Sequence, residues 1–264
     1  MKVYISADIE GVTGVTDWDE TELGHHTHAL AAAQMKREVM AAVKGALAAG
    51  AKEIYVKDAH DSGRNMDYTG FPEEVTLIRS WTNTPESMMA GIDESFDAVI
   101  YIGYHSAAYG NGNPLAHTMN TGNNYFKINN EFFSEFDLNS LIASHYGVPV
   151  VFLSGDVALA ERAKSVVPNM EVLGVKKGVG EATFNMSTEK ALKLIESGVK
   201  KKKKKAKKCK YPTADKYTME INYKEHVRAL RASYYPGVKQ IDEHTVRFTA
   251  KNVPDLIACR MFIL

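Results

Sequence analysis

The chain of 264 residues is 45% hydrophobic and 24% charged, which is the composition of a globular protein with a sizeable core rather than of a disordered one. It lacks the roughly 20 consecutive apolar residues of a membrane span, and acids at Asp8 and Glu10 come too early for a signal peptide, so we expect a cytoplasmic protein without membrane contact. Nine lysines between Lys200 and Lys210 balance the net charge; without them 23 basic residues face 32 acidic ones, which argues against a nucleic-acid binder.

Strands and helices are predicted to alternate in the first part of the chain. Runs of β-branched and aromatic residues predict four short strands, over 2–7, 52–56, 98–102 and 148–153. Between the first two, apolar residues at helical spacing predict a helix over 29–49, which Gly50 ends, and another helix follows from Ala158. This order predicts an α/β fold with a mostly parallel sheet flanked by helices, in which ligands gather at the carboxyl ends of the strands.

The rest of the chain mixes strands and helices in a different order. Asn129 and Asn130 separate two short apolar runs and predict a tight hairpin turn, and helices are predicted over 135–145 and 188–197. Two strands and a closing helix are predicted after the lysines, over 216–223, 245–249 and 253–264. We therefore expect an α/β catalytic core, a lysine-rich linker or loop, and a smaller C-terminal α+β lobe packed on the core, over 1–199, 200–210 and 211–264.

The lysine run over 200–210 is low in complexity. Like charges at helical spacing repel each other, so a solvated loop or an extension of the preceding helix is the simpler interpretation. A contact with nucleic acid, anionic lipid or an acidic partner is the alternative interpretation.

Acids and histidines follow three of the predicted strands, where a parallel sheet would bring them to one edge. Asp8 and Glu10 follow the first strand on the same side of the chain, and two such carboxylates repel each other unless a cation or a proton intervenes. His60 follows the second strand and His105 follows the third. Mixed carboxylate and imidazole ligands suit zinc or another divalent transition metal, so this edge is a candidate metal site.

Two further positions admit two interpretations each. Glu135 and Asp137 begin a predicted helix, where acids also simply complement the helix dipole. His117 follows His105 across a loop rich in glycine and asparagine, which is able to fold back over a metal site. A loop histidine with no chemical task is the alternative interpretation for His117.

Several short blocks occur in the order and at the spacing that characterise one family of peptidases. They are Asp8-Ile9-Glu10-Gly11-Val12-Thr13-Gly14, Asp58-Ala59-His60-Asp61-Ser62, Gly103-Tyr104-His105, His117-Thr118-Met119, Glu135-Phe136-Asp137-Leu138-Asn139, Val148-Pro149-Val150 and Ser154-Gly155-Asp156. With these blocks the sequence resembles the zinc-dependent D-aminopeptidases of the dipeptide-transport type, from residue 1 to about 175 and more faintly beyond. The lysine run departs from the family pattern.

The resemblance implies both a chemistry and an assembly. Two zinc ions per subunit would be bridged by Asp8 and held by the other metal ligands, Glu10, His60, His105 and Glu135. His117 would be catalytic rather than a ligand. The enzyme would remove an N-terminal residue, a D-amino acid, from short peptides or amides, and it would form a homo-oligomeric ring, a decamer in the best-known member. This agrees with general chemistry, since two metals that share a carboxylate activate a water at neutral pH.

Two other functions stay open from the residues alone. The same metals would serve an amidase or a phosphoesterase, although a phosphoesterase favours a nearby cation and only Arg64 is an obvious candidate. A non-catalytic, metal-stabilised assembly protein that binds an acidic partner through 200–210 is the second alternative. The presence of His117 beyond the proposed ligands argues against that alternative.

Overall fold

Seven strands form the larger of two sheets in the computed structural model, which describes residues 1–201 and 206–264. Their order across the sheet is β3 (Val75–Ile78), β2 (Glu53–Asp58), β1 (Lys2–Ala7), β4 (Ala98–Tyr104), β7 (Val150–Asp156), β8 (Glu171–Val179) and β9 (Ala182–Asn185). Neighbouring strands are parallel except for β9, which pairs antiparallel with β8. The predicted, mostly parallel sheet is therefore confirmed.

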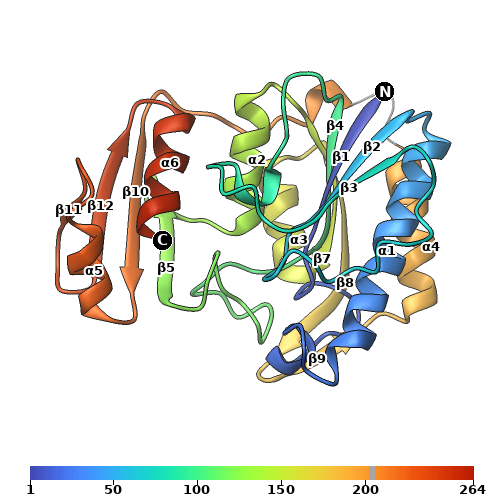
Figure 1. Cartoon of the computed structure of the whole chain (residues 1–264), viewed down its shortest axis with the longest axis horizontal. Helices are drawn as coiled ribbons and strands as arrows, with labels where there is room; N and C mark the ends of the chain where they lie inside the picture. The colour runs from blue at the N-terminus through green and yellow to red at the C-terminus, as the bar shows by residue number, and fades with distance from the viewer. Residues whose placement is uncertain (202–205) are drawn as a thin grey trace.

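Helices cover both faces of this sheet. On one face lie α1 (His28–Ala48) and α4 (Thr188–Lys200), which pack against each other, and on the other lie α2 (Glu135–His145) and α3 (Val157–Val166) (Figure 1). Met35, Val39 and Val43 have the helical spacing expected of α1 and are all fully buried. Short 3-10 helices interrupt the loops as η1 (Trp18–Glu20), η2 (Ser87–Met89) and η3 (Ala206–Lys208). In the described part of the chain, no helix has the length and apolar character needed to cross a membrane.

A smaller antiparallel sheet stands beside α2 (Figure 1). Its strands are β11 (Lys239–Gln240), β12 (Thr245–Ala250), β10 (Tyr217–Tyr223), β5 (Asn123–Ile128) and β6 (Glu131–Phe132), in that order. The hairpin β5–β6 turns at Asn129 and Asn130, whose φ angles of 51° and 70° lie in the left-handed region that asparagine tolerates. Two helices pack on this sheet, α5 (His226–Ala232) and α6 (Val253–Ile263), and α6 also contacts α2.

The smaller C-terminal α+β lobe is thus confirmed, with one addition that the sequence did not predict. The hairpin β5–β6 comes from the middle of the chain and pairs with β10 of the C-terminal part. The exact division at 199 and 211 stays a prediction. Of the lysine run, Lys200 ends α4 and η3 covers Ala206–Lys208, whereas the predictions for 202–205 lie outside the described residues.

The chain changes direction across the larger sheet between β1 and β4. From β1 it runs outwards through β2 to β3, and it then returns to the other side of β1 for β4, β7 and β8. Such a reversal in an open α/β sheet leaves a crevice at the carboxyl ends of the strands. Two glycines let the strand ends approach there: a Cβ at Gly11 would overlap the carbonyl of Tyr104, and one at Gly103, where φ is +71°, would overlap the carbonyl of Asp8.

Candidate metal centre

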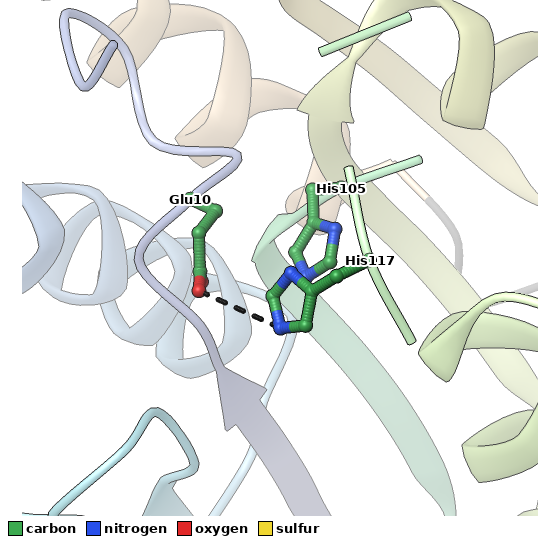
Figure 2. A group of neighbouring side chains, drawn as sticks. All are labelled: Glu10, His105 and His117. Carbon is green, nitrogen blue, oxygen red and sulfur yellow. Dashed lines mark ion pairs between the residues drawn. The ribbon is translucent and has the colours of Figure 1, made fainter. Parts of the chain in front are cut away.

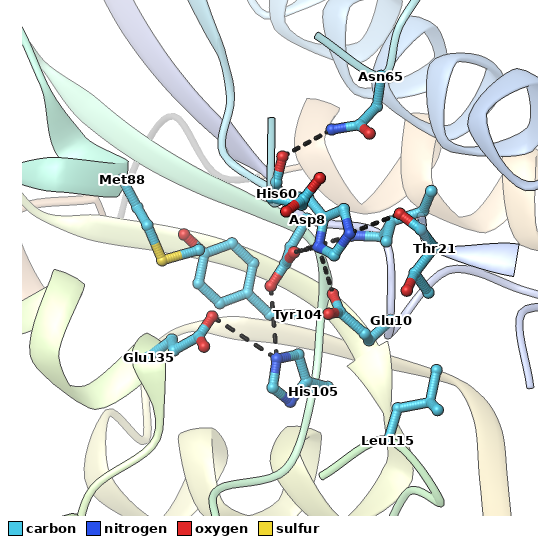
Figure 3. A network of polar contacts seen from close by, with 12 residues as sticks. Asp8, Glu10, Thr21, His60, Asn65, Met88, Tyr104, His105, Leu115 and Glu135 are labelled. Carbon is cyan, nitrogen blue, oxygen red and sulfur yellow. Dashed lines mark hydrogen bonds and ion pairs between the residues drawn. The ribbon is translucent and has the colours of Figure 1, made fainter. Parts of the chain in front are cut away.

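The residues predicted as ligands (Figure 3) and the predicted catalyst His117 (Figure 2) converge on this crevice. Asp8 and Glu10 follow β1, His60 follows β2 and His105 follows β4. Glu135 is the first residue of α2, and His117 lies in the loop between β4 and β5. A cleft of about 380 Å³ opens onto all of them except the fully buried His105.

The ligand atoms form two groups that share Asp8. In the first group, His60 Nδ1 lies 3.4 Å from Asp8 Oδ1 and 3.1 Å from Glu10 Oε2. In the second, His105 Nε2 lies 3.6 Å from Asp8 Oδ2 and 3.6 Å from Glu135 Oε2. The two oxygens of Asp8 therefore face different groups, which is the orientation that a carboxylate adopts when it bridges two ions.

Some of the buried ligand atoms lack hydrogen-bond partners. Among the described residues, Asp8 Oδ2, Glu10 Oε2 and His105 Nε2 have none. A buried donor or acceptor left unsatisfied costs about 1–3 kcal/mol, and a charged one costs more. A divalent cation between these atoms would satisfy each of them, so the residues present fit a metal.

Backbone carbonyls fix the orientation of each imidazole. In every case the ring nitrogen remote from the acids donates to a carbonyl oxygen: His60 Nε2 to Thr21 at 2.8 Å, His105 Nδ1 to Ser106 at 2.9 Å, and His117 Nδ1 to Leu115 at 2.9 Å. The other nitrogen of a neutral ring then carries a lone pair that faces the carboxylates. A metal ligand needs that tautomer, and hydrogen bonds of this kind commonly select it.

Local structure explains why Glu135, and not Asp137, reaches the cluster. Asp137 forms a capping box with Ser134 and accepts hydrogen bonds from its N and Oγ at 3.0 and 2.7 Å. Its carboxylate is therefore used to start α2. Glu135 instead accepts a hydrogen bond from Met119 N at 2.6 Å through Oε1 and presents Oε2 to His105.

His117 lies beside the two groups and closer to the cleft. Its ring stacks on His105, with centroids 4.3 Å apart and an interplanar angle of 16° (Figure 2). Its Nε2 lies 3.5 Å from Glu135 Oε1 and 3.8 Å from Glu10 Oε1, so it faces an acid of each group. The geometry accommodates His117 both as a ligand, with Glu10 and His105, and as a group that faces the substrate.

The electrostatics of the cluster call for positive charge. Burial, followed by the charge of Glu10, raises the pKa of Asp8 well above its ordinary value. Burial opposes ionisation of Glu135 as well, but His105 outweighs it and lowers the pKa of Glu135 to about 2. Burial likewise disfavours a charged His105, but Glu135 raises its pKa to about 10. Without a metal, the neighbouring acids therefore favour the protonated forms of His60 and His105.

The sequence did not identify the walls of the cleft. Trp18 in η1 and Trp81 after β3 both line it, and Trp81 Nε1 donates to the carbonyl of Asp61 at 2.7 Å. The chain contains only two tryptophans, and both lie here. Their rarity was the one signal in the sequence that pointed to them.

The site consists of two buried groups of carboxylate and imidazole ligands that share one acid and open to a cleft. This is the site of a metal-dependent hydrolase. Residues 1–262 match the model of the M55 peptidases, described as D-aminopeptidases, and the chain belongs to this family. It is 29% identical over 258 residues to a D-aminopeptidase of Bacillus subtilis strain 168. This match covers 96% of this chain and 93% of that protein.

A solved structure has the same fold. The Zn-dependent D-aminopeptidase DppA from Bacillus subtilis, described as a self-compartmentalizing protease, matches with a TM-score of 0.91 and 27% sequence identity. The match covers 100% of this chain and 96% of that one. The predicted family, its fold and its class of activity are therefore confirmed.

Proposed function

We propose that the chain is a dinuclear zinc aminopeptidase in which Asp8 bridges the two ions. Glu10 and His60 would complete one site, and His105 and Glu135 would complete the other. The observation that carries this proposal is the shared Asp8, whose oxygens face separate groups of ligands. Zinc is supported by the ligand set and by the related structure, which is described as Zn-dependent.

The protein's own residues supply positioning and proton transfer. Zinc bound at this centre contributes Lewis acidity, which activates water and polarises a peptide carbonyl. His117, whose Nδ1 is tied to the Leu115 carbonyl, presents Nε2 beside the acids and would give a proton to the leaving amine. Trp18 and Trp81 form apolar walls that limit the access of water.

The charge of the cleft suits a substrate with a free amine. Its lining includes the outer acids Glu22 and Asp61, and no lysine or arginine is among the described residues that line it. Once two divalent ions balance the charges of Asp8, Glu10 and Glu135, these outer acids would still attract a positively charged N-terminus. Arg64, the cation considered for a phosphoesterase, lies outside this lining, which argues against that alternative.

The proposal includes a homo-oligomer, with a decamer as the expected state and short peptides as substrates. The related structure, described as a self-compartmentalizing protease, supports a homo-oligomer, while the decamer rests on the family resemblance. Preference for a D-residue is supported by the family description. The cytoplasmic location and the absence of a nucleic-acid partner stay predictions from the sequence.

A screen of aminoacyl anilides on the zinc-loaded protein tests the function. We expect turnover of D-aminoacyl p-nitroanilides, loss of turnover with a chelator, and recovery with zinc. p-Nitrophenyl phosphate, assayed beside them, should not be hydrolysed. A folded, zinc-loaded protein that cleaves no aminoacyl anilide or short peptide would contradict the proposal.

A further inference from the structure

Two buried carboxylates outside the proposed ligand set also lie at the carboxyl edge of the sheet. Asp58 ends β2 and Asp156 ends β7, and both are completely buried. Neither belongs to a group of side chains in the described residues that could hold a metal. Asp58 instead accepts hydrogen bonds from the loop that follows its own strand and carries His60. Asp156 accepts hydrogen bonds from the residue after His105, in the loop that follows the neighbouring strand β4.

Asp58 organises the loop that carries His60. Its Oδ2 accepts hydrogen bonds from the backbone N–H groups of Asn65 and Met66, at 2.7 and 2.8 Å. Its Oδ1 accepts from Asn65 Nδ2 at 2.8 Å, and the same amide donates to the carbonyl of His60 at 2.7 Å (Figure 3). Asp58 thus holds the backbone of His60 through one intermediate side chain.

Asp156 has the same relation to His105. Its Oδ2 accepts from Ser106 N at 2.6 Å, and its Oδ1 accepts from Ser106 Oγ at 2.7 Å. The carbonyl of Ser106 in turn accepts the hydrogen bond from His105 Nδ1. Asp156 therefore fixes the residue whose carbonyl orients the imidazole, while its Oδ1 also caps α3 by accepting from Leu159 N at 2.8 Å.

The two networks are almost separate. Two side chains lie between Asp156 and the backbone of Glu10, a ligand of the other group: the ammonium of Lys176, which donates to the Glu10 carbonyl and is attracted by Asp156, and Asn113, whose Nδ2 donates to the same carbonyl at 2.9 Å. The same nitrogen lies 3.5 Å from Asp156 Oδ2, beyond the usual length of a hydrogen bond. Each carboxylate therefore acts mainly on one histidine.

We propose that Asp58 and Asp156 are positioning residues, one for each ion of the centre. Asp58 would set the affinity of the group of Asp8, Glu10 and His60, and Asp156 would set that of the group containing His105. The inference rests on the proposed dinuclear function. Its physical basis is that a ligating imidazole binds a metal well only when its orientation is held by outer hydrogen bonds, whose loss weakens binding about 10- to 100-fold.

The test uses Asp58→Asn and Asp156→Asn, each of which serves as the control for the other. Asparagine keeps the size of the side chain and one acceptor oxygen, and it remains a good cap for α3 at position 156. Each change is made in chains that keep one group only, His105→Ala and His60→Ala. Zinc affinity is then measured by competition with a chromophoric chelator.

A crossed pattern is expected. In His105→Ala, Asp58→Asn should weaken the remaining ion about 10- to 100-fold, while Asp156→Asn should stay within about twofold, the scatter of independent sites. In His60→Ala the two effects should exchange. Asn65→Ala, which removes the intermediate side chain, should reproduce the effect of Asp58→Asn.

If His105→Ala or His60→Ala holds no zinc, Asp58→Asn and Asp156→Asn are instead made in the otherwise unaltered chain and compared by cobalt titration. Asp58→Asn should then raise the dissociation constant of one cobalt ion, and Asp156→Asn should raise that of the other. The inference alone would be overturned if, in folded protein, both variants weaken the binding of the same ion, or if neither changes the affinity for either ion by more than about twofold. An unaltered chain that binds no stoichiometric metal would refute the proposed function and this inference with it.

Discussion

Replacing His117 by alanine separates a catalytic role from a ligand role. The Nε2 atom of His117 lies 3.5 Å from Glu135, within the 3.1–3.6 Å that His60 and His105 make to their acids, and 3.8 Å from Glu10, slightly beyond it. Its side chain is, however, 13% exposed, whereas that of His105 is 1% exposed. A ligand would take its metal with it when removed, while a proton donor that faces the substrate would leave both metals in place.

The expected loss follows from the position of His117 beside the cleft. General acid–base catalysis by a positioned side chain is worth about 10²–10⁴ in rate. We therefore expect kcat of His117→Ala to fall about 10²-fold or more, which corresponds to about 2.7 kcal/mol of transition-state stabilisation. The lost stack on His105 should lower the free energy of unfolding by only about 0.5–1.5 kcal/mol.

The assay compares His117→Ala with His105→Ala, measuring zinc content and turnover of a D-aminoacyl anilide side by side. His105→Ala should lose the ion of its own group and, with it, activity. His117→Gln keeps much of the size of the side chain, but glutamine cannot donate or accept a proton near neutral pH. It should therefore be about as slow as His117→Ala. Loss of zinc from His117→Ala, or turnover close to that of the parent, would show that the catalytic role is wrongly assigned.

Four further experiments test the ligand set, the charge of the metal-free site, the lysine run and the assembly. Asp8→Ala should lose most of both ions, because its two oxygens face both groups, and elemental analysis of the folded variant decides this. The metal-free protein should lose stability as pH rises, because the folded state raises the pKa of His105 to about 10. The stability that protonated His105 contributes is complete below the ordinary histidine pKa of about 6.5 and disappears as pH approaches 10. Thermal unfolding against pH should show this decline without zinc and little of it with zinc, and a flat metal-free profile would contradict it. Replacing 200–205 with serine and glycine should leave turnover within a few-fold of the parent, since no described residue of the lysine run lines the cleft. Light scattering should find a species far larger than the 29.2 kDa chain, and an active monomer would refute the assembly.

The central strands of the larger sheet were predictable because their residues are buried on both faces. β1, β4 and β7 are mainly apolar or aromatic, apart from Lys2 and Ser6 in β1, Gly103 in β4 and Ser154-Gly155-Asp156 at the end of β7. β3 was missed because it is a short, partly exposed edge strand, and β8 was missed because lysines and glycines dilute its apolar pattern. Lys176 of β8 is buried, and its ammonium donates to the carbonyls of Glu10 and Val15, contacts that no local sequence pattern predicts.

The candidate site was predictable as far as its residues lie at strand ends. Acids and histidines there are visible in the sequence, since parallel strands place their carboxyl ends together. Glu135 needed the family resemblance, because an acid in the first turn of a helix has an ordinary structural explanation. The hydrogen bond that orients His60 goes to the Thr21 carbonyl in a distant segment and is invisible in the sequence, whereas those of His105 and His117 go to carbonyls one and two residues away.

The pairing of β5 with β10 places the completion of the smaller sheet late in protein synthesis. During translation, Asp8, Glu10, His60 and His105 emerge with the strands of the larger sheet. His117 and Glu135, by contrast, flank the hairpin β5–β6, whose neighbour in the smaller sheet is made only with Tyr217–Tyr223. A two-stranded hairpin alone is marginally stable in water. The hairpin next to His117 and Glu135 is therefore expected to gain its full stability only after Tyr217–Tyr223 have been made.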